Sequence, residues 1–278
     1  MSPNLRTALL AGGIAVGLLV GGGIGYAFGR AASSETRGRE SPRPSGEASS
    51  ASSVPTPTGS VEASSTGAPA VAIGATGAIL RASRASDVTL GPSTIACGSL
   101  VTPGLTGECG DVNVSGGRVV WVVERAAVAN GVSGFRVRIL VYSPADGGWI
   151  QRLAADDLGG RRWSSIAVLP ADLTNDGVPE LLVGYRGVSE REPLDLDVVG
   201  YAQDGAPEVL AHPDRADRGA VLVNAAAQLL EYAAQYAAGE APCCPGAYER
   251  RTIVFEGGVL RQVATEEIAP SAVPPSQL

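Results

Sequence analysis

The residues whose types and spacing best suit a chemical task form one short segment, Asp172-Leu-Thr-Asn-Asp-Gly-Val-Pro-Glu180. Acidic or hydroxyl oxygens stand at its first, third, fifth and ninth positions, and Gly177 stands at the sixth, where a loop around a cation must turn sharply. Calcium is a hard cation that takes several oxygen ligands. The spacing therefore predicts a Ca²⁺ loop with five protein ligands, which are Asp172, Thr174, Asp176, the carbonyl of Val178 and Glu180.

The segment does not fit an EF-hand, which places a bidentate Glu at the twelfth position of its loop, where this chain has Val183. The flanking runs, 164–169 and 181–183, are short and apolar, as expected for strands rather than for amphipathic helices. A second interpretation stays open: a tight Asn-Asp-Gly turn between two strands, with its acids merely solvated.

Residues 167–183 resemble the D-x-[DN]-x-DG-x-x-[DE]-hydrophobic core of FG-GAP and VCBS repeats. The resemblance implies a calcium-binding loop in an extracellular β-protein, typically a propeller or an adhesion-type protein. Thr174 stands where the family usually has Asp or Asn, which removes one charge from the site. Because the motif occurs once, the resemblance implies this loop and not a whole multi-bladed propeller.

The part of the chain that must position this loop, residues 71–268, has mostly strand signals. Runs rich in Val, Ile, Tyr and Trp predict strands at 118–123, 135–142 and 194–201. Strand, Gly-containing turn and returning strand follow one another in Arg136–Ala154, Leu194–Ala211 and Arg251–Ala264. The predicted fold is mainly β: an antiparallel β-rich domain, either sandwich-like or a partial propeller of hairpins.

One segment of that domain, Asn224–Ala238, predicts a helix, because Leu and Tyr residues are set on an Ala-rich background. The same run also suits a strand. The last residues, 269–278, contain three prolines and predict a disordered tail.

The start of the chain predicts a membrane anchor. The sequence divides into a cytoplasmic tail (1–6), a transmembrane helix (7–29) and a disordered Ser/Pro/Thr/Gly linker (30–70). Glycine recurs every four residues along one face of that helix, at Gly13, Gly17, Gly21, Gly25 and Gly29. Such a face permits self-association of the helix, although a weakly hydrophobic anchor from a Gly/Ala-rich proteome explains it as well.

The four cysteines, Cys97, Cys109, Cys243 and Cys244, predict disulfides formed in an oxidising compartment. Pairing of Cys97 with Cys109 closes a short loop and leaves the other two as a vicinal pair or as thiols, while cross-pairing would tie the two ends of the domain together. A zinc site is the competing interpretation, but C-x-x-C is absent and His212 is the only histidine.

The segment Gly239-Glu-Ala-Pro-Cys-Cys-Pro-Gly246, with the strand-like run that follows it, resembles the corresponding region of LppP/LprE-type envelope lipoproteins of actinobacteria.

The positive-inside rule alone favours a cytoplasmic C-terminal side. The linker, the cysteines and the calcium-type loop favour the opposite orientation. We therefore expect a single-pass protein of the cell membrane whose C-terminal domain is extracytoplasmic.

Composition narrows the function. The net charge of −7 and the lack of a basic patch argue against nucleic-acid binding. His212 is predicted to lie in a surface turn, and the sequence offers no recognisable catalytic motif. The sequence predicts a non-enzymatic binding module of the cell envelope, with an envelope protein or a glycan as its ligand. The alternative is an enzyme that acts on cell-wall glycan through paired acids, Asp156-Asp157 or Asp195/Asp197.

Overall fold

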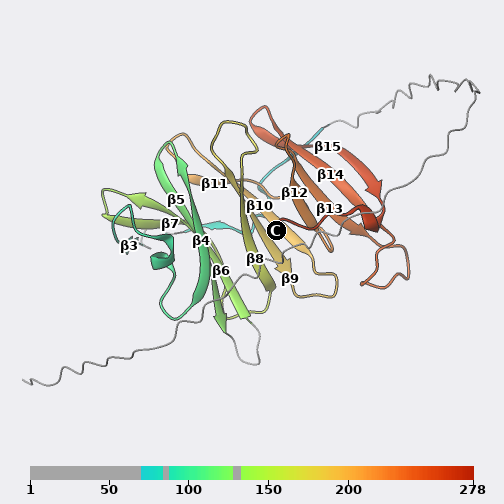
Figure 1. Cartoon of the computed structure of the whole chain (residues 1–278), viewed down its shortest axis with the longest axis horizontal. Coiled ribbons are helices and arrows are strands. Elements are labelled where there is room, and N and C mark those ends of the chain that lie inside the picture. Colours follow the sequence, from blue (N-terminus) through green and yellow to red (C-terminus); the bar gives the residue numbers. More distant parts are fainter. Residues whose placement is uncertain (1–69, 84–87, 128–132) are drawn as a thin grey trace, which may run out of the picture. The chain divides into compact units, whose positions relative to one another are not determined.

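A computed structural model of the chain describes residues 70–83, 88–127 and 133–278, which belong to one compact unit, Glu62–Leu278. These residues are mainly β and form three antiparallel sheets (Figure 1). Each sheet is built on four strands that are consecutive in the sequence. The predicted class, an antiparallel β-rich domain, is therefore confirmed.

The predicted cytoplasmic tail, transmembrane helix and linker lie outside the described residues, apart from the linker's last residue. Within the part of the chain that is described, no helix is long and apolar enough to cross a membrane.

The first sheet contains β4 (Thr106–Val114), β5 (Gly117–Ala127), β6 (Ser133–Ser143) and β7 (Gly148–Asp157), and β2 (Arg81–Ala82) and β3 (Val88–Leu90) both pair with β7. The middle sheet contains β8 (Trp163–Ala171), β9 (Glu180–Gly187), β10 (Leu194–Tyr201) and β11 (Pro207–Ala211). The third sheet contains β12 (Ala220–Val223), β13 (Leu229–Gln235), β14 (Ala247–Glu256) and β15 (Val259–Ile268), with β1 (Val71–Ile73) paired outside β15. Two short 3₁₀ turns, Cys97–Leu100 and Pro270–Ala272, complete the described elements.

The three predicted hairpins are all present, as β6–β7, β10–β11 and β14–β15. Glycine makes their turns possible, because it adopts positive φ without strain. Gly205 has φ +79° in the β10–β11 turn, and Gly257 and Gly258 have φ +61° and +84° in the β14–β15 turn.

The middle sheet is buried on both faces. Leu181 and Val183 of β9 pack in a core shared with the first sheet, whereas Leu182 between them packs in a core shared with the third sheet. Because successive side chains of a strand point to opposite faces, a doubly covered strand needs an unbroken apolar run. The run Leu181-Leu182-Val183 meets that need, and it begins directly after Glu180.

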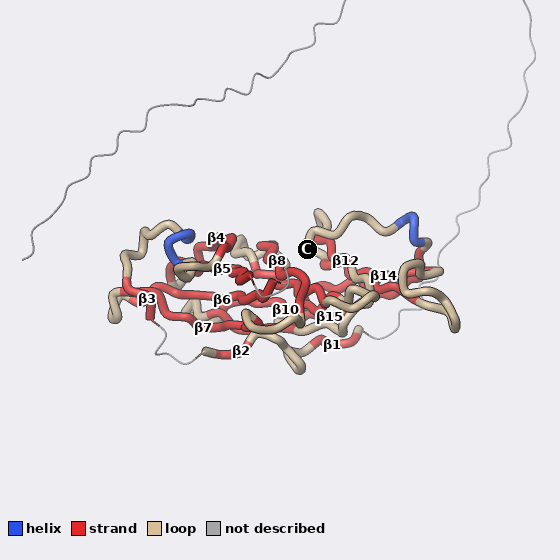
Figure 2. The backbone as a smooth tube through the Cα atoms, turned by 90° about the horizontal axis from the view of Figure 1, so that it is seen from below, coloured by secondary structure: helices blue, strands red, loops and turns tan. Residues whose placement is uncertain are grey.

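The N-terminal segment of the domain joins the two outer sheets. β1 belongs to the third sheet and β2 to the first, so residues 74–80 cross from one to the other, on one side of the sheets (Figure 2). The backbone of His212 holds the start of this crossing, since its amide donates to the Gly74 carbonyl at 2.9 Å. Asp197 holds its end by accepting the amides of Ile79 and Leu80, at 3.0 and 2.7 Å for the shorter bond of each.

In the segment Asn224–Ala238, which suits a helix or a strand by its sequence, the structure has a turn followed by the strand β13 and no helix. Asn224 Oδ1 accepts the amides of Ala226 and Gln228, which closes a turn between β12 and β13. Leu229 then packs in the core shared with the middle sheet, and its neighbour Leu230 packs in a cluster on the other face of the third sheet. Burial on both faces within the sheet therefore outweighed the helix preference of the alanines.

The C-terminal residues, expected to form a disordered tail, are bound to the third sheet. The Gln277 amide donates to the Val221 carbonyl of β12 at 2.8 Å, and the Gln277 side chain accepts the Val223 amide at 2.8 Å. Leu278 packs against the core between the middle and third sheets, close to Gly184. Pro270 begins the short 3₁₀ turn, whereas Pro274 and Pro275 favour an extended backbone, which suits a segment that runs along β12.

Candidate functional site

The Asp172–Glu180 loop connects β8 to β9 and is closed by its own carboxylates. Asp172 accepts the amides of Asp176 and Gly177 at 3.2 and 3.0 Å. Asp176 Oδ1 accepts the amide of Val178 at 2.8 Å. Gly177, at φ +85°, turns the chain back over these carboxylates, as expected for the sixth position.

Glu180, the first residue of β9, is the buried member of the loop, with 4 % of its surface exposed. Its Oε2 accepts the amides of Leu173 and Thr174 at 2.8 and 3.3 Å, and its Oε1 accepts the Thr174 hydroxyl at 3.2 Å. Burial raises the pKa of Glu180, although these hydrogen bonds work in the opposite direction. Thr174, the departure from the repeat pattern, thus fastens the buried carboxylate.

Four of the five predicted ligands line one cavity of about 580 Å³, namely Thr174, Asp176, Val178 and Glu180. Turns from all three sheets complete its wall: the β4–β5 turn of the first sheet, the β10–β11 connection of the middle sheet and the β14–β15 turn of the third. The fifth predicted ligand, Asp172, lines a different cavity of about 380 Å³, beside the β12–β13 turn.

Tyr201 is a polar group in this cavity that the sequence did not point to. Its hydroxyl is buried and has no hydrogen-bond partner among the described residues. Burial, together with the nearby charge of Glu180, raises the pKa of Tyr201 well above its ordinary value, so the hydroxyl remains a donor at ordinary pH. The sequence contained one signal for it: Tyr201 stands two residues after Val199 in the same predicted strand, so the two side chains share a face of that strand. Val199 is buried on that face.

The donor types of the loop fit calcium, because all of them are oxygens. In the structure the carboxylates of Asp172 and Asp176 accept hydrogen bonds from amides of the same loop. Within residues 70–83, 88–127 and 133–278, no three His, Cys, Asp or Glu side chains lie close enough together to hold a metal ion. A carboxylate oxygen accepts at more than one lone pair, so the amide bonds of Asp172 and Asp176 leave room for a further partner. Calcium is therefore compatible with the donors of the loop and would have to draw them together.

The cysteines form two pairs. Cys97 is bonded to Cys109, which closes a loop over the first sheet, here called the disulfide loop. Cys243 is joined to its neighbour Cys244 in an exposed connection between β13 and β14. Cross-pairing is thus not formed, and all four sulfurs are used, so the zinc interpretation has no thiolate left to supply a ligand.

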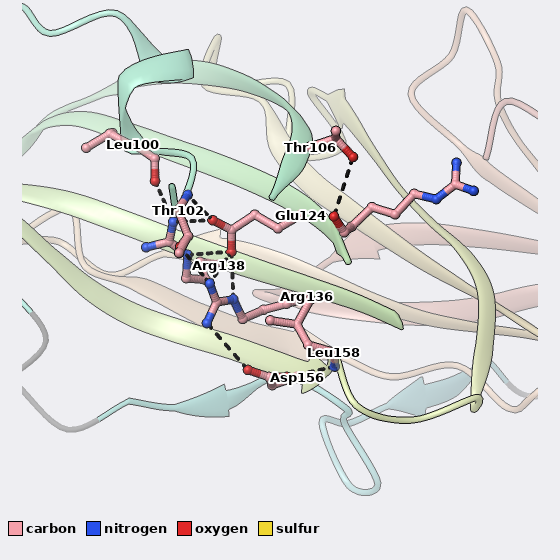
Figure 3. A network of polar contacts seen from close by, with 9 residues as sticks. Leu100, Thr102, Thr106, Glu124, Arg136, Arg138, Asp156 and Leu158 are labelled. Atoms are coloured by element: carbon pink, nitrogen blue, oxygen red, sulfur yellow. Dashed lines mark hydrogen bonds and ion pairs between the residues drawn. The ribbon is translucent and has the colours of Figure 1, made fainter. Parts of the chain in front are cut away.

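A buried ion cluster fixes the disulfide loop to the first sheet (Figure 3). Glu124 of β5 accepts from Arg136 and Arg138 of β6 at 2.6 and 2.7 Å, and from the Thr102 amide at 2.6 Å. Arg138 also donates to the Leu100 carbonyl. Burial works to raise the pKa of Glu124, but the bonds from Arg138, Arg136 and Thr102 prevail and lower it to about 2. The charges of Glu124, Arg136 and Arg138 therefore have a structural role, which is to hold the disulfide loop on the first sheet.

His212 does not lie in an open surface turn, as predicted, but is mostly buried, with 13 % of its side chain exposed. Its Nδ1 lies 2.7 Å from Oδ1 of Asp197, which is fully buried. The hydrogen bond to Asp197 raises the pKa of His212 against the effect of burial. Tyr185 also donates to Asp197, at 3.2 Å. An acid inside the apolar strand Leu194–Tyr201 was the signal for this network.

The paired acids considered for glycan chemistry have separate structural tasks. Asp156 accepts the amide of Leu158 and lies 3.6 Å from Arg136, whereas Asp157 accepts the amide of Arg162 at 2.7 Å. In the second pair, Asp197 is occupied by the network described above.

Comparison of the chain with protein-family models, with curated proteins and with solved structures found no match. The likeness of residues 167–183 to FG-GAP and VCBS repeats, and that of the Cys-Cys-Pro segment to LppP/LprE-type lipoproteins, therefore stay resemblances of short sequences.

Proposed function

We propose that this chain is a membrane-tethered, extracytoplasmic interaction module of the cell envelope, and that calcium stiffens its Asp172–Glu180 loop. One observation carries the proposal: four residues of that loop line a cavity of about 580 Å³ together with turns from all three sheets. A loop at such a place can present a ligand surface whose shape depends on every sheet. Stiffening the loop would preorganise that surface, which lowers the entropy lost on binding.

The finer architecture that we propose is a partial propeller of hairpins. Three consecutive four-stranded antiparallel units pack face to face, and each unit contributes a turn to the cavity. This arrangement supports the resemblance to FG-GAP and VCBS repeats at the level of one loop, since the loop joins the first two strands of the middle unit.

The compartment follows from the sequence and the cysteines together. An apolar run at residues 7–29 and a Ser/Pro-rich linker precede the sheets. The disulfide of the loop over the first sheet is a bond that persists in oxidising compartments. We infer that the anchor is single-pass, that its glycine face allows self-association, and that the β-rich domain lies outside the membrane, where an envelope protein or a glycan is its ligand.

The test is co-sedimentation of the purified chain with isolated bacterial cell-wall fragments, with calcium or with chelator. We expect the chain to pellet with the fragments in calcium and to stay largely in solution in chelator. Asp176→Ala should abolish the calcium dependence. Asp146→Ala is the matched control, because Asp146 also bonds within a β-turn but lies in the β6–β7 turn, away from the cavity. Equal binding by wild type and Asp176→Ala in both conditions would refute the role of the loop.

A further inference from the structure

Glu231 is a buried acid whose hydrogen bonding is incomplete. It lies on β13, its side chain is 1 % exposed, and its Oε2 is 3.3 Å from a guanidinium nitrogen of Arg251. Its Oε1 is buried without a hydrogen-bond partner among the described residues. An unpaired buried carboxylate oxygen is costly to a fold, so a group with this geometry calls for a functional explanation.

Glu231 lines a cavity of about 240 Å³, here called the Glu231 cavity. Its walls come from β1, from the segment that follows β11 and from the face of the third sheet. The polar lining residues are Thr76, His212, Asp214, Glu231, Arg251 and Gln262. The volume lies below the range typical of drug-sized ligands, so the cavity suits a small one. It shares no lining residue with the cavity at the Asp172–Glu180 loop.

The charges around Glu231 favour a cation. Arg251 is the guanidinium beside it, and Arg251 is shared with Glu249, whose Oε1 lies 2.5 Å from Nε. Asp214 adds a further negative charge to the cavity wall. The positive charge of His212 is offset by buried Asp197 at 2.7 Å. The acids therefore outnumber the bases, and an anionic ligand would meet net repulsion.

We propose that the Glu231 cavity binds a small organic cation through an ammonium group, which donates a hydrogen bond to Glu231 Oε1. An ammonium supplies both the missing donor and the missing positive charge. A metal ion fits less well, because the described residues contain no group of three His, Cys, Asp or Glu side chains gathered as metal ligands. The site is separate from the calcium-type loop and does not depend on the proposed function.

The ionisation of Glu231 gives the site a pH dependence. Burial raises the pKa of Glu231 to about 7, Arg251 lowers it, and Asp214 and Glu249 raise it. His212, whose pKa is raised by its bond to Asp197, is the other titratable group in the cavity wall. Below pH 7 Glu231 becomes neutral and His212 is positive, and both changes weaken the binding of a cation. From pH 8 to pH 6 the ionised fraction of a group with this pKa falls about tenfold, so the affinity should fall at least as much.

The test is titration of the full-length chain with ethanolamine, followed by ligand-observed NMR, with ethylene glycol as the uncharged probe of similar size. We expect saturable binding of ethanolamine at pH 8, about tenfold weaker binding at pH 6, and no comparable binding of ethylene glycol. Glu231→Gln should weaken ethanolamine binding at least tenfold, a loss of about 1.4 kcal/mol. Glu256→Gln is the matched control, since Glu256 is an exposed acid on the neighbouring strand β14 and does not line the cavity, and this variant should bind like wild type.

Three results would overturn the proposal: equal binding of ethylene glycol, undiminished binding by folded Glu231→Gln, or no saturable binding of ethanolamine by the folded wild type. If Glu231→Gln does not fold, carboxyl ¹³C NMR of the wild type decides. Ethanolamine must then lower the pKa of Glu231, because the cation favours its charged form. An unchanged pKa would count against the site.

Discussion

Asp197 Oδ1 lies 2.7 Å from His212 Nδ1, and this contact joins β10 to the residue that follows β11. The same carboxylate accepts the amides of Ile79 and Leu80 and the hydroxyl of Tyr185. Ile79 and Leu80 end the segment that crosses between the outer sheets. One buried side chain of the middle sheet therefore fastens a connection between the first and third sheets.

Replacement of this carboxylate should destabilise the domain. Asp197→Asn leaves at least one amide or imidazole donor unsatisfied, and we expect the free energy of unfolding to fall by about 3 kcal/mol. Urea unfolding followed by tryptophan fluorescence measures the change. Asp195→Asn, two residues away on the same strand and only half-buried, should cost less than about 1 kcal/mol. Equal effects of the two substitutions would show that Asp197 is not an anchor.

The imidazole of His212 should stabilise the domain most at low pH. Its bond to Asp197 raises its pKa in the folded state above 6.5. A raised pKa means that the contribution is complete below the unfolded value, about 6.5, and is lost as the pH rises through the folded value. The difference in unfolding free energy between wild type and His212→Gln should therefore shrink from pH 6 to pH 9. A difference that does not change over this range would show that the bond to Asp197 does not raise the pKa of His212 in the folded state.

The disulfide between Cys97 and Cys109 should stabilise the domain through its loop. The two residues are 12 positions apart, and in the loop-entropy model closing such a loop contributes about 3 kcal/mol. The Cys97→Ser/Cys109→Ser variant should lose about that much in urea unfolding. Alkylation of the unreduced, denatured wild type, followed by mass analysis, should leave both residues unlabelled. Labelling of both would also remove an argument for the extracytoplasmic location.

Calcium should raise the thermal midpoint. Asp172, Asp176 and Glu180 place three carboxylates in one short loop, and a divalent cation removes their mutual repulsion. At a hundred times its dissociation constant, a ligand adds about 2.7 kcal/mol to stability. Scanning calorimetry in calcium and in chelator measures the shift, which Asp176→Ala should abolish with little loss of fold, because Asp176 is exposed. Identical melting of wild type in both conditions would mean that the loop is only a turn.

The orientation in the membrane can be tested directly. If residues 1–6 are cytoplasmic, protease added to intact spheroplasts should degrade the β-rich domain. Linker composition and cysteine use support this orientation, although the positive-inside rule does not. A cytoplasmic marker protein should stay intact in the same sample. Full protection of the domain would establish the opposite orientation.

The sheets were predictable to the extent that local pattern determines them. Alternating or unbroken apolar runs with glycine turns identified the β6–β7, β10–β11 and β14–β15 hairpins. For Asn224–Ala238 the helix was the first choice and the strand the alternative, because its alanines favour a helix locally and only the pairing of β13 with the neighbouring strands β12 and β14 decides for the strand. The binding of Gln277 and Leu278 to the third sheet depends on contacts far away in the sequence, which no local pattern reveals.

The candidate sites divide in the same way. The Asp172–Glu180 loop is contiguous, so its spacing was visible, and the structure adds that Asp172 lines a different cavity from the other four residues. The Asp197–His212 and Glu231–Arg251 contacts join residues from different strands. Their only trace in the sequence is an acid within an apolar run, and such an acid does not name its partner.

The attachment of β1 to the third sheet has a mechanical consequence. β1 is three residues long and is the first of the described elements that a pull from the N-terminal side would reach. If its short pairing with β15 parted first, the pull would next load the bond between the His212 amide and the Gly74 carbonyl, and then the buried carboxylate that holds Ile79 and Leu80. The domain would thus lengthen at its N-terminal end by the few residues of this strand before the four consecutive strands of any sheet had to separate.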